Sequence, residues 1–439
     1  MANSSMTFDI HRSHFANQIN ENLLGQKVRI GGWVEDTRDI GKLAFAIIRD
    51  VTGSVQVIAN DDDNLQLLKN IPRQSAVIVS GLVQKGKAKG FSVEVKVQEL
   101  IVLSRAVHPL PIDPTGRVES ANDKRLDSRA LDLRNPRIAA IFRVRSMALH
   151  IIRKTLSSKD FIEVHTPKII GSASEGGSNL FGFPYFKKKA YLAQSPQLYK
   201  EQLILALDRV FEIGPYFRAE NSHTVRHLNE FISVDLEAAF LDYEDIMDIV
   251  EEVIRNIISE LRKNCKSELE SVASDQIAIP IYESSIDRLT YEQCLKELVR
   301  EGEELKFGDD LSDASLRKLG AIHPGFYFIT DWPTSLKPFY IYENEDDPRI
   351  SKSFDLQYGY LELVSGGRRQ HDSLKLRARL VKQGLDPIDF SEHLEAFNWG
   401  MPPHSGCGLG FDRLMMVLLN SQNIRDVVLY PRDTERISP

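Results

Sequence analysis

The chain has 439 residues, and its hydrophobic share of 42% and charged share of 27% are those of an ordinary soluble globular protein. This length exceeds what a single hydrophobic core usually supports, so we expect about two or three domains. The formal net charge of −7 argues against a protein coated in nucleic acid, although it leaves room for a local basic surface.

The sequence carries no sign of a membrane or of an oxidising compartment. It contains no uninterrupted apolar stretch long enough to span a bilayer, and residues 1–13 lack the apolar core of a signal peptide. Cys265, Cys294 and Cys407 are widely separated and form no CxxC pair, which argues against a disulfide framework or a cysteine-rich zinc site. We therefore expect a cytoplasmic protein that does not contact a membrane.

Residues 1–104 have the pattern of a β domain. Short segments in which apolar and polar side chains alternate are separated by turns rich in Gly, Asp and Asn. These segments are 28–34, 45–48, 55–57, 77–79 and 93–97. About five strands that close on one another form a small barrel, and the five-stranded OB-fold is a version that binds oligonucleotides. We therefore predict an OB-fold β-barrel over residues 1–104.

Beyond this domain the sequence changes character twice. Residues 105–136 contain four prolines among charged residues and are predicted to be a linker or hinge. Apolar residues at helical spacing then predict helices over 138–151 and 243–261, and acidic residues crowd the start of the second helix, as the helix dipole favours. We predict that residues 137–439 form one α+β domain.

The chemically most informative segment is 209–240, whose pattern is that of a strand, a charged loop and a second strand. Its charged and aromatic residues include Arg218, Glu220, His223, Arg226, His227, Phe231, Asp235 and Glu237. Side chains at alternate strand positions share one face of a sheet, so these residues would form a floor of fixed charges that suits a polyanion with metal ions. A salt-bridged, solvated hairpin explains the same segment when it is considered alone.

A glycine-rich strand that runs directly into an apolar helix provides a second pattern. The glycines are Gly406, Gly408 and Gly410, and the helix carries Arg413. Glycines let a ligand approach the backbone closely, and an arginine at a helix start can bind a phosphate. Tight packing of the strand against the helix explains the glycines as well.

Together these segments resemble the three signature motifs of the class II aminoacyl-tRNA synthetases. Residues 161–170 (FIEVHTPKII) resemble motif 1, FRAE and RHLNEF within 217–231 resemble motif 2, and GLGFDR at 408–413 resembles motif 3. With an N-terminal OB-fold, the chain is similar to the subgroup that charges tRNA with Asp, Asn or Lys, and its length is similar to that of aspartyl enzymes of the archaeal and eukaryotic type. The resemblance implies a catalytic domain built on an antiparallel β-sheet flanked by helices. It also implies a homodimer, because motif 1 builds a two-fold interface in this class.

The implied reaction activates L-aspartate with ATP and Mg²⁺ and transfers the aspartyl group to the 3′ end of tRNA-Asp. The resemblance assigns catalysis to Arg218, at the α-phosphate, and to Arg413, at the γ-phosphate. The other residues implied in ATP binding are Glu220, Arg226, His227, Phe231 and Glu362, and the implied Mg²⁺ ligands are Glu362 and Ser365. Because the aspartate nucleophile is already ionised, cations need only cancel charge repulsion and hold the atoms in line.

Selection of aspartate depends, by the same resemblance, on Lys200 and Arg369. Their cations would pair with the side-chain carboxylate and reject the amide of asparagine. Arg368 stands where the family often has glutamine, which leaves open which of the two arginines faces the substrate. The remaining implied aspartate contacts are Glu175, Gln197 and Asp235, at the α-ammonium group, and Ser365.

The OB-fold would read the anticodon. The resemblance implies that Phe45 stacks on the central base and that Gln56 reads its edge. Considered alone, Phe45 is also explained as a core residue. Lys85, Lys87 and Lys89 form a basic turn that suits the anticodon stem, and a solvated hairpin tip explains this turn as well.

Other functions remain open at this point. An asparaginyl enzyme of the same class usually lacks a lysine at the position of Lys200. A non-discriminating aspartyl enzyme would also charge tRNA-Asn, and the sequence does not decide between the two kinds. An asparagine synthetase built on the same catalytic domain would have no use for an OB-fold. A catalytically inactive RNA-binding paralogue would have lost Arg218, Arg413 or Glu362, and all three are present.

Overall fold

The structure is a computed structural model that describes residues 9–87, 90–171, 180–221, 224–272 and 285–439. The chain separates into two compact units, one up to Lys124 and one from Arg125 onwards. The proline-containing segment 105–136 is therefore shared between the two units.

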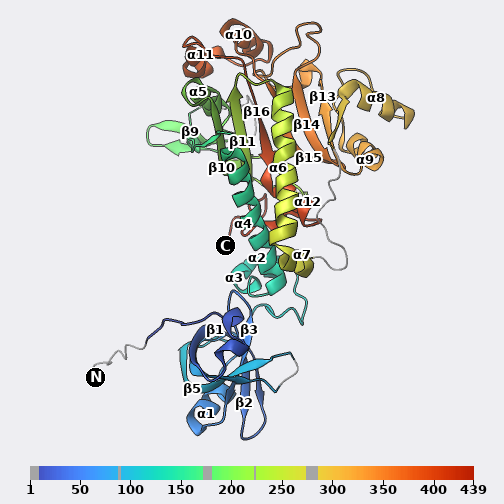
Figure 1. The fold of residues 1–439 in the computed structure, drawn as a ribbon. Coiled ribbons are helices and arrows are strands. Elements are labelled where there is room, and N and C mark those ends of the chain that lie inside the picture. Colours follow the sequence, from blue (N-terminus) through green and yellow to red (C-terminus); the bar gives the residue numbers. More distant parts are fainter. Residues whose placement is uncertain (1–8, 88–89, 172–179, 222–223, 273–284) are drawn as a thin grey trace. The chain divides into compact units, whose positions relative to one another are not determined.

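The first unit is a closed five-stranded barrel with the strand order β1-β2-β3-β5-β4, which confirms the predicted OB-fold (Figure 1). The strands are β1 (Lys27–Asp39), β2 (Ala44–Arg49), β3 (Ser54–Ala59), β4 (Ala76–Lys85) and β5 (Val93–Ser104). Each contains one of the predicted alternating segments, because alternation places one set of side chains in the barrel core. A helix that the sequence analysis did not predict, α1 (Asp62–Asn70), begins at the Asp61 cap between β3 and β4.

The second unit is built on an eight-stranded sheet with the order β12-β13-β14-β15-β16-β11-β10-β6 (Figure 1). The strands are β6 (Ile162–Glu163), β10 (Arg209–Phe217), β11 (Glu230–Ala239), β12 (Asp287–Thr290), β13 (Phe326–Thr330), β14 (Ser353–Tyr358), β15 (Leu361–Arg368) and β16 (His404–Gly410). The central strands are antiparallel, as predicted. The sheet is mixed at its two edges, where β6 pairs parallel with β10 and β12 pairs parallel with β13.

Two long helices, α4 (Pro136–Ser157) and α6 (Tyr243–Asn264), lie side by side and confirm the two predicted helices (Figure 1). The remaining helices are α2 (Asn122–Asp127), α3 (Arg129–Asp132), α5 (Gln197–Leu207), α7 (Lys266–Val272), α8 (Tyr291–Arg300), α9 (Asp313–Ile322), α10 (Ser373–Lys382), α11 (Ser391–Phe397) and α12 (Phe411–Leu418). A small sheet consists of β7 (Ile169–Ile170), β9 (Lys188–Leu192) and β8 (Gly182–Tyr185).

Strand β11 shows how the sheet separates the hydrophobic core from the polar face. Val234, Leu236 and Ala238 belong to the same core cluster as the apolar residues of α4 and α6. The residues between them, which include Asp235 and Glu237, must point to the opposite face, because successive strand side chains alternate. The helices therefore bury one face of the sheet and leave the other for charged groups.

The segment 424–432 completes the second unit from a distant part of the chain. Arg129, whose side chain is only 1% exposed, donates hydrogen bonds to the carbonyl oxygens of Arg425, Val428 and Leu429 at 2.8 to 2.9 Å. The same segment forms backbone hydrogen bonds with the loop that precedes β11, at Val225 and Asn229. The shape of that loop thus depends on residues about 200 positions later.

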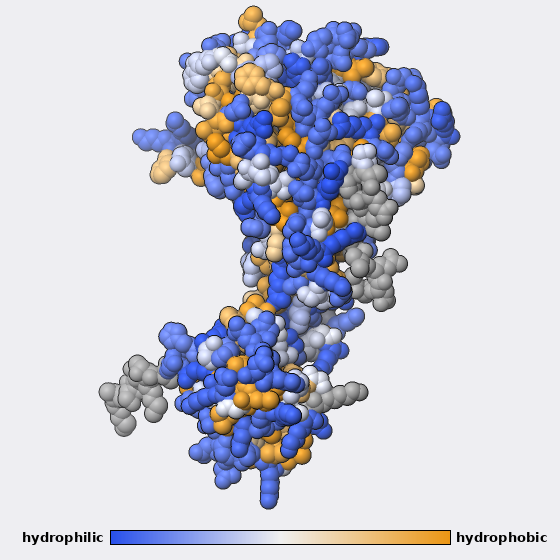
Figure 2. Space-filling model, viewed as in Figure 1, coloured by the Kyte–Doolittle hydropathy of each residue, from blue (hydrophilic) through white to orange (hydrophobic). Residues whose placement is uncertain are grey.

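Hydrophilic residues cover most of the visible surface of each unit (Figure 2). Within the described residues, no helix is long and apolar enough to cross a membrane.

Candidate active site

A cleft of about 410 Å³ opens over the polar face of the central strands. It is lined by most of the residues that the sequence analysis selected, from β11, from and just after β15, from the starts of α5 and α12, and from the loop between β10 and β11. These are Gln197, Arg218, Glu220, Arg226, His227, Phe231, Asp235, Glu362, Ser365, Arg369 and Arg413. Lys200 lies behind the cleft wall, as described below, and Glu175 lies outside the described residues.

One end of the cleft is cationic. The Arg218 guanidinium carbon lies 5.4 Å from the centre of the Phe231 ring, and Arg413 donates to the Glu362 carbonyl oxygen at 3.1 Å. Burial lowers the pKa of His227, and the neighbouring Arg413 lowers it further. A neutral His227 between arginines can donate or accept a hydrogen bond without adding to the positive charge.

Carboxylates gather next to this cationic end. Glu362 is exposed to the cleft; desolvation by the surrounding protein raises its pKa, and the neighbouring Asp355 carboxylate raises it further. Asp355 lies on β14 in register with Ser365, and its Oδ2 accepts from Lys337 at 2.7 Å. Its buried Oδ1 has no hydrogen-bond partner among the described residues. The sequence analysis did not select Asp355, because no local motif surrounds it and only the pairing of β14 with β15 brings it here.

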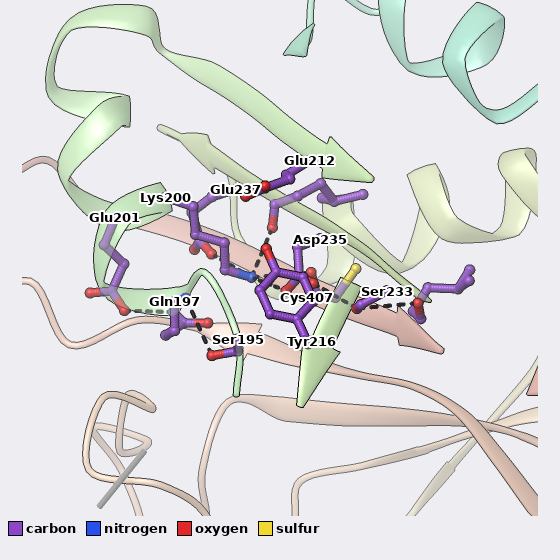
Figure 3. Close-up of polar contacts among 12 residues, drawn as sticks. Ser195, Gln197, Lys200, Glu201, Glu212, Tyr216, Ser233, Asp235, Glu237 and Cys407 are labelled. Atoms are coloured by element: carbon purple, nitrogen blue, oxygen red, sulfur yellow. Dashed lines mark hydrogen bonds and ion pairs between the residues drawn. The ribbon is translucent and has the colours of Figure 1, made fainter. Parts of the chain in front are cut away.

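The other end of the cleft has an ion-pair network as its floor (Figure 3). Glu237, which is fully buried, binds Arg369 through two hydrogen bonds of 3.0 and 3.2 Å. Its Oε2 also lies 3.3 Å from the Lys200 ammonium, which is 3.2 Å from Asp235. Two cations and two carboxylates thus alternate beneath the cleft.

The surroundings of Lys200 bear directly on its predicted role. Besides the two carboxylates, its ammonium lies 3.4 Å from the carbonyl oxygen of Leu236 and 3.2 Å from that of Cys407. An ammonium has three donors, so four acceptors already saturate it. A substrate carboxylate could bind Lys200 only by replacing one of these partners, whereas Arg369 lines the cleft directly.

The glycines of β16 make room for this network rather than for a ligand at every position. A Cβ atom at Gly406 would lie 2.2 Å from a carboxylate oxygen of Glu237, and one at Gly408 would lie 3.1 Å from Asp235. Only residues without a side chain let the acidic side chains of β11 cross the neighbouring strand. The sequence analysis expected these glycines to let a ligand approach the backbone. At Gly406 the space is instead filled by the Glu237 side chain.

The barrel carries its candidate site on an outer face. In β2, Ala44, Ala46 and Ile48 are buried, so the alternating residue Phe45 points outward, and the interpretation of Phe45 as a core residue is wrong. Gln56 lies on the same face by register but is only 7% exposed, and it donates to Glu94 at 2.6 Å. Lys85 and Lys87 are exposed, whereas Lys89 lies outside the described residues.

Comparisons with known proteins agree with both units. A family model for class II tRNA synthetases (D, K and N) matches residues 121–434, and a model for the OB-fold nucleic acid binding domain matches residues 28–103. The chain is 45% identical over 417 residues to the aspartate--tRNA(Asp) ligase of Thermoplasma acidophilum, which covers 94% of this chain and 97% of the relative. The chain is a class II tRNA synthetase of the aspartate–tRNA ligase family.

Other members of the family extend the comparison to the whole chain. An aspartate--tRNA(Asp/Asn) ligase of Methanothermobacter thermautotrophicus is 42% identical over 437 residues, covering 98% of this chain and 99% of the relative. Among solved structures, the asparaginyl-tRNA synthetase of Pyrococcus horikoshii with asparaginyl-adenylate has a TM-score of 0.91 at 33% identity, over 98% of this chain and 100% of that chain. A putative aspartyl-tRNA synthetase of Leishmania major has a TM-score of 0.90 at 29% identity, over 99% of this chain and 96% of that chain. The backbone is thus shared with asparaginyl enzymes, and the two relatives named above as aspartate ligases are 42% and 45% identical to the chain.

Proposed function

We propose that this enzyme activates L-aspartate with ATP to aspartyl-adenylate and transfers the aspartyl group to the 3′ end of tRNA-Asp. The observation that carries the proposal is the pair of cations, Arg369 and Lys200, in the ion-pair network at one end of the cleft. We call this end the amino-acid end. A substrate with a negative side chain would bind Arg369 directly, and Lys200 by replacing one of its present partners, whereas an amide would direct an N–H group at one of these cations. The names of the relatives support the same substrate.

The cationic end of the cleft suits the phosphates of ATP. Arg218, just after β10, and Arg413, on α12, both line the cleft and would stabilise the charge on the α- and γ-phosphates. Phe231 offers a flat face for the adenine, and Glu220 an acceptor for its amino group. Arg226 and His227 would contact the outer phosphates.

The carboxylates beside the phosphate end fit Mg²⁺. Asp355 has a buried oxygen without a partner among the described residues, and the elevated pKa of Glu362 reflects desolvation by the cleft walls and repulsion between two acids, which a cation would relieve. Glu362, Asp355 and the Ser365 hydroxyl would hold the ion. When bound, it supplies positive charge that offsets the repulsion between the phosphates and the attacking carboxylate.

The α-ammonium group of aspartate would be bound by Gln197 and Asp235 from the floor of the cleft, and by Glu175. The OB-fold would bind the anticodon through Phe45 and Gln56 on its outer face. Whether tRNA-Asn is charged as well depends on this face, and the relatives include both kinds of ligase. A homodimer through motif 1 and a cytoplasmic location belong to the same proposal.

Aminoacylation of tRNA-Asp and tRNA-Asn transcripts with labelled aspartate and, separately, asparagine tests the proposal. We expect aspartate to be transferred to tRNA-Asp, and transfer to both tRNAs would make the enzyme non-discriminating. Transfer of asparagine alone would refute the assignment and favour an asparaginyl enzyme. Absence of both transfer and ATP–pyrophosphate exchange would leave an RNA-binding function.

A further inference from the structure

A cluster of three buried titratable side chains lies beneath the amino-acid end of the cleft. Glu201 of α5 and His404 of β16 are fully buried, and His393 of α11 is 2% exposed. The imidazole Nε2 atoms of both histidines lie 3.6 Å from Glu201 Oε2, and none of these three atoms has a hydrogen-bond partner among the described residues. Neither the sequence motifs nor the reaction described above accounts for this cluster.

The two histidines fix the charge on Glu201. The Nδ1 of His404 lies 2.8 Å from the Pro402 carbonyl oxygen, which only accepts, so this nitrogen must carry a proton. Burial alone would raise the pKa of Glu201, but the two imidazoles outweigh burial and hold it below its usual range. Glu201 is therefore an ionised carboxylate that faces the two imidazoles.

The second oxygen of Glu201 is directed at the substrate site (Figure 3). Its Oε1 accepts from the Gln197 side-chain nitrogen Nε2 at 2.5 Å. A carboxylate accepts only, so the amide of Gln197 must turn its nitrogen inward, and its Oε1 is left on the side of the cleft that the residue lines. An amide oxygen in that place is an acceptor for the α-ammonium group of an amino acid.

We propose that Glu201, buried against His393 and His404, is a positioning residue that fixes the orientation of the Gln197 amide for recognition of the substrate ammonium. The inference rests on the proposed function, in which Gln197 binds that group. It adds a requirement: the acceptor depends on a carboxylate one helical turn away that touches no substrate atom. The orientation of the amide is thus set before the substrate arrives.

The substitution Glu201→Gln isolates this role, because it keeps the side-chain volume. The Nδ1 of His393 faces the Gln202 side-chain nitrogen at 3.5 Å and accepts from it, so His393 Nε2 is a donor. The new amide oxygen faces this donor, its NH₂ faces Gln197, and the Gln197 nitrogen turns toward the cleft. We expect the KM for aspartate in ATP–pyrophosphate exchange to rise roughly 10- to 100-fold, as the loss of a hydrogen bond to a charged group implies. The KM for ATP should stay near the wild-type value.

A second substitution tests the geometry. In the double variant Glu201→Gln with Gln197→Glu, the carboxylate and the amide exchange places, the charge of the pair is unchanged, and an acceptor again faces the cleft. The KM for aspartate should fall back toward the wild-type value. Glu251→Gln, a buried glutamate on α6 that is bonded to Arg255, is the matched control for stability and should leave both KM values unchanged.

Three results would overturn the inference. The first is an unchanged KM for aspartate in folded Glu201→Gln. The second is a variant in which kcat falls, both KM values rise and the unfolding midpoint falls together, with no recovery in the double variant. That pattern is expected of a cluster with a purely structural role. If the wild-type enzyme shows no aspartate-dependent exchange, the proposed function fails first, and the inference fails with it.

Discussion

Replacing Lys200 by methionine tests the ion-pair network most directly. Methionine keeps the length of the side chain and removes its charge, so Asp235 and Glu237 lose the cation that lies 3.2 and 3.3 Å away. Lys200 is only 3% exposed, and water cannot easily replace the missing charge. The substitution should therefore affect both the stability of the catalytic unit and the binding of aspartate.

The two effects have separate magnitudes. Removing one partner of a buried ion pair typically costs about 3–5 kcal/mol. Because Arg369 still neutralises Glu237, the lower end, about 3 kcal/mol, is expected here, which lowers the melting temperature of a large domain by about 6 °C. Loss of a charge partner for the substrate costs a similar amount, so kcat/KM for aspartate should fall about 100-fold.

Thermal unfolding and ATP–pyrophosphate exchange measure these two effects. Lys159→Met is the control, because Lys159 forms a more exposed pair with Glu252 at 2.6 Å, and such pairs contribute at most about 1 kcal/mol. If Lys200→Met melts at a lower temperature but keeps its KM for aspartate, then Lys200 supports the floor of the cleft and does not recognise the substrate. An unchanged melting temperature would refute the electrostatic reasoning itself.

Three further predictions concern other parts of the molecule. Phe45→Ala should raise the KM for tRNA by about 5- to 100-fold, as loss of one stacked base implies, while pyrophosphate exchange, which needs no tRNA, stays unchanged; loss of both would contradict the assignment. Arg218→Ala should abolish exchange and leave tRNA binding in a filter assay largely intact, and equal loss of both would refute its role. Burial lowers the pKa of His371, and the neighbouring Arg368 lowers it further. As the pH falls, the unfolded chain therefore takes up the His371 proton at a higher pH than the folded chain does. The free energy of unfolding should then fall as the pH drops below about 6.5. His371→Gln should flatten that fall between pH 7.5 and 5.5, and an identical fall in the variant would disprove the cause.

The sequence predicted the elements whose side chains repeat with a strong period. The barrel strands and the helices α4 and α6 follow from alternation and from three- and four-residue spacing. The helix α1 was not predicted, because it is short and starts in a run of acidic residues that resembles a turn. In the segment 264–340, mixed charged and apolar residues gave no clear period, although α8, α9 and β13 pack together there.

The residues of the candidate site also differ in whether the sequence alone could identify them. Arg218, Glu362 and Arg413 were found because motifs surround them, and all line one cleft. Contacts made only by tertiary packing could not be found from sequence: Glu201 meets His393 and His404 across about 190 to 200 positions. The saturation of Lys200 by backbone carbonyl oxygens likewise depends on how α5 crosses β11 and β16.

The contacts of segment 424–432 have a consequence for the order of events during synthesis. The loop before β11 and Arg129 of α3 both form hydrogen bonds with this segment. The segment leaves the ribosome long after the loop and Arg129 do. The barrel has all its strands by Ser104 and can fold early, since domains fold as units from the N-terminus. A nascent chain thus carries a complete OB-fold well before it has a complete cleft. A chain whose translation stops before Ile424 would keep the OB-fold and lack a complete catalytic cleft. Such a chain would compete with the finished enzyme for tRNA.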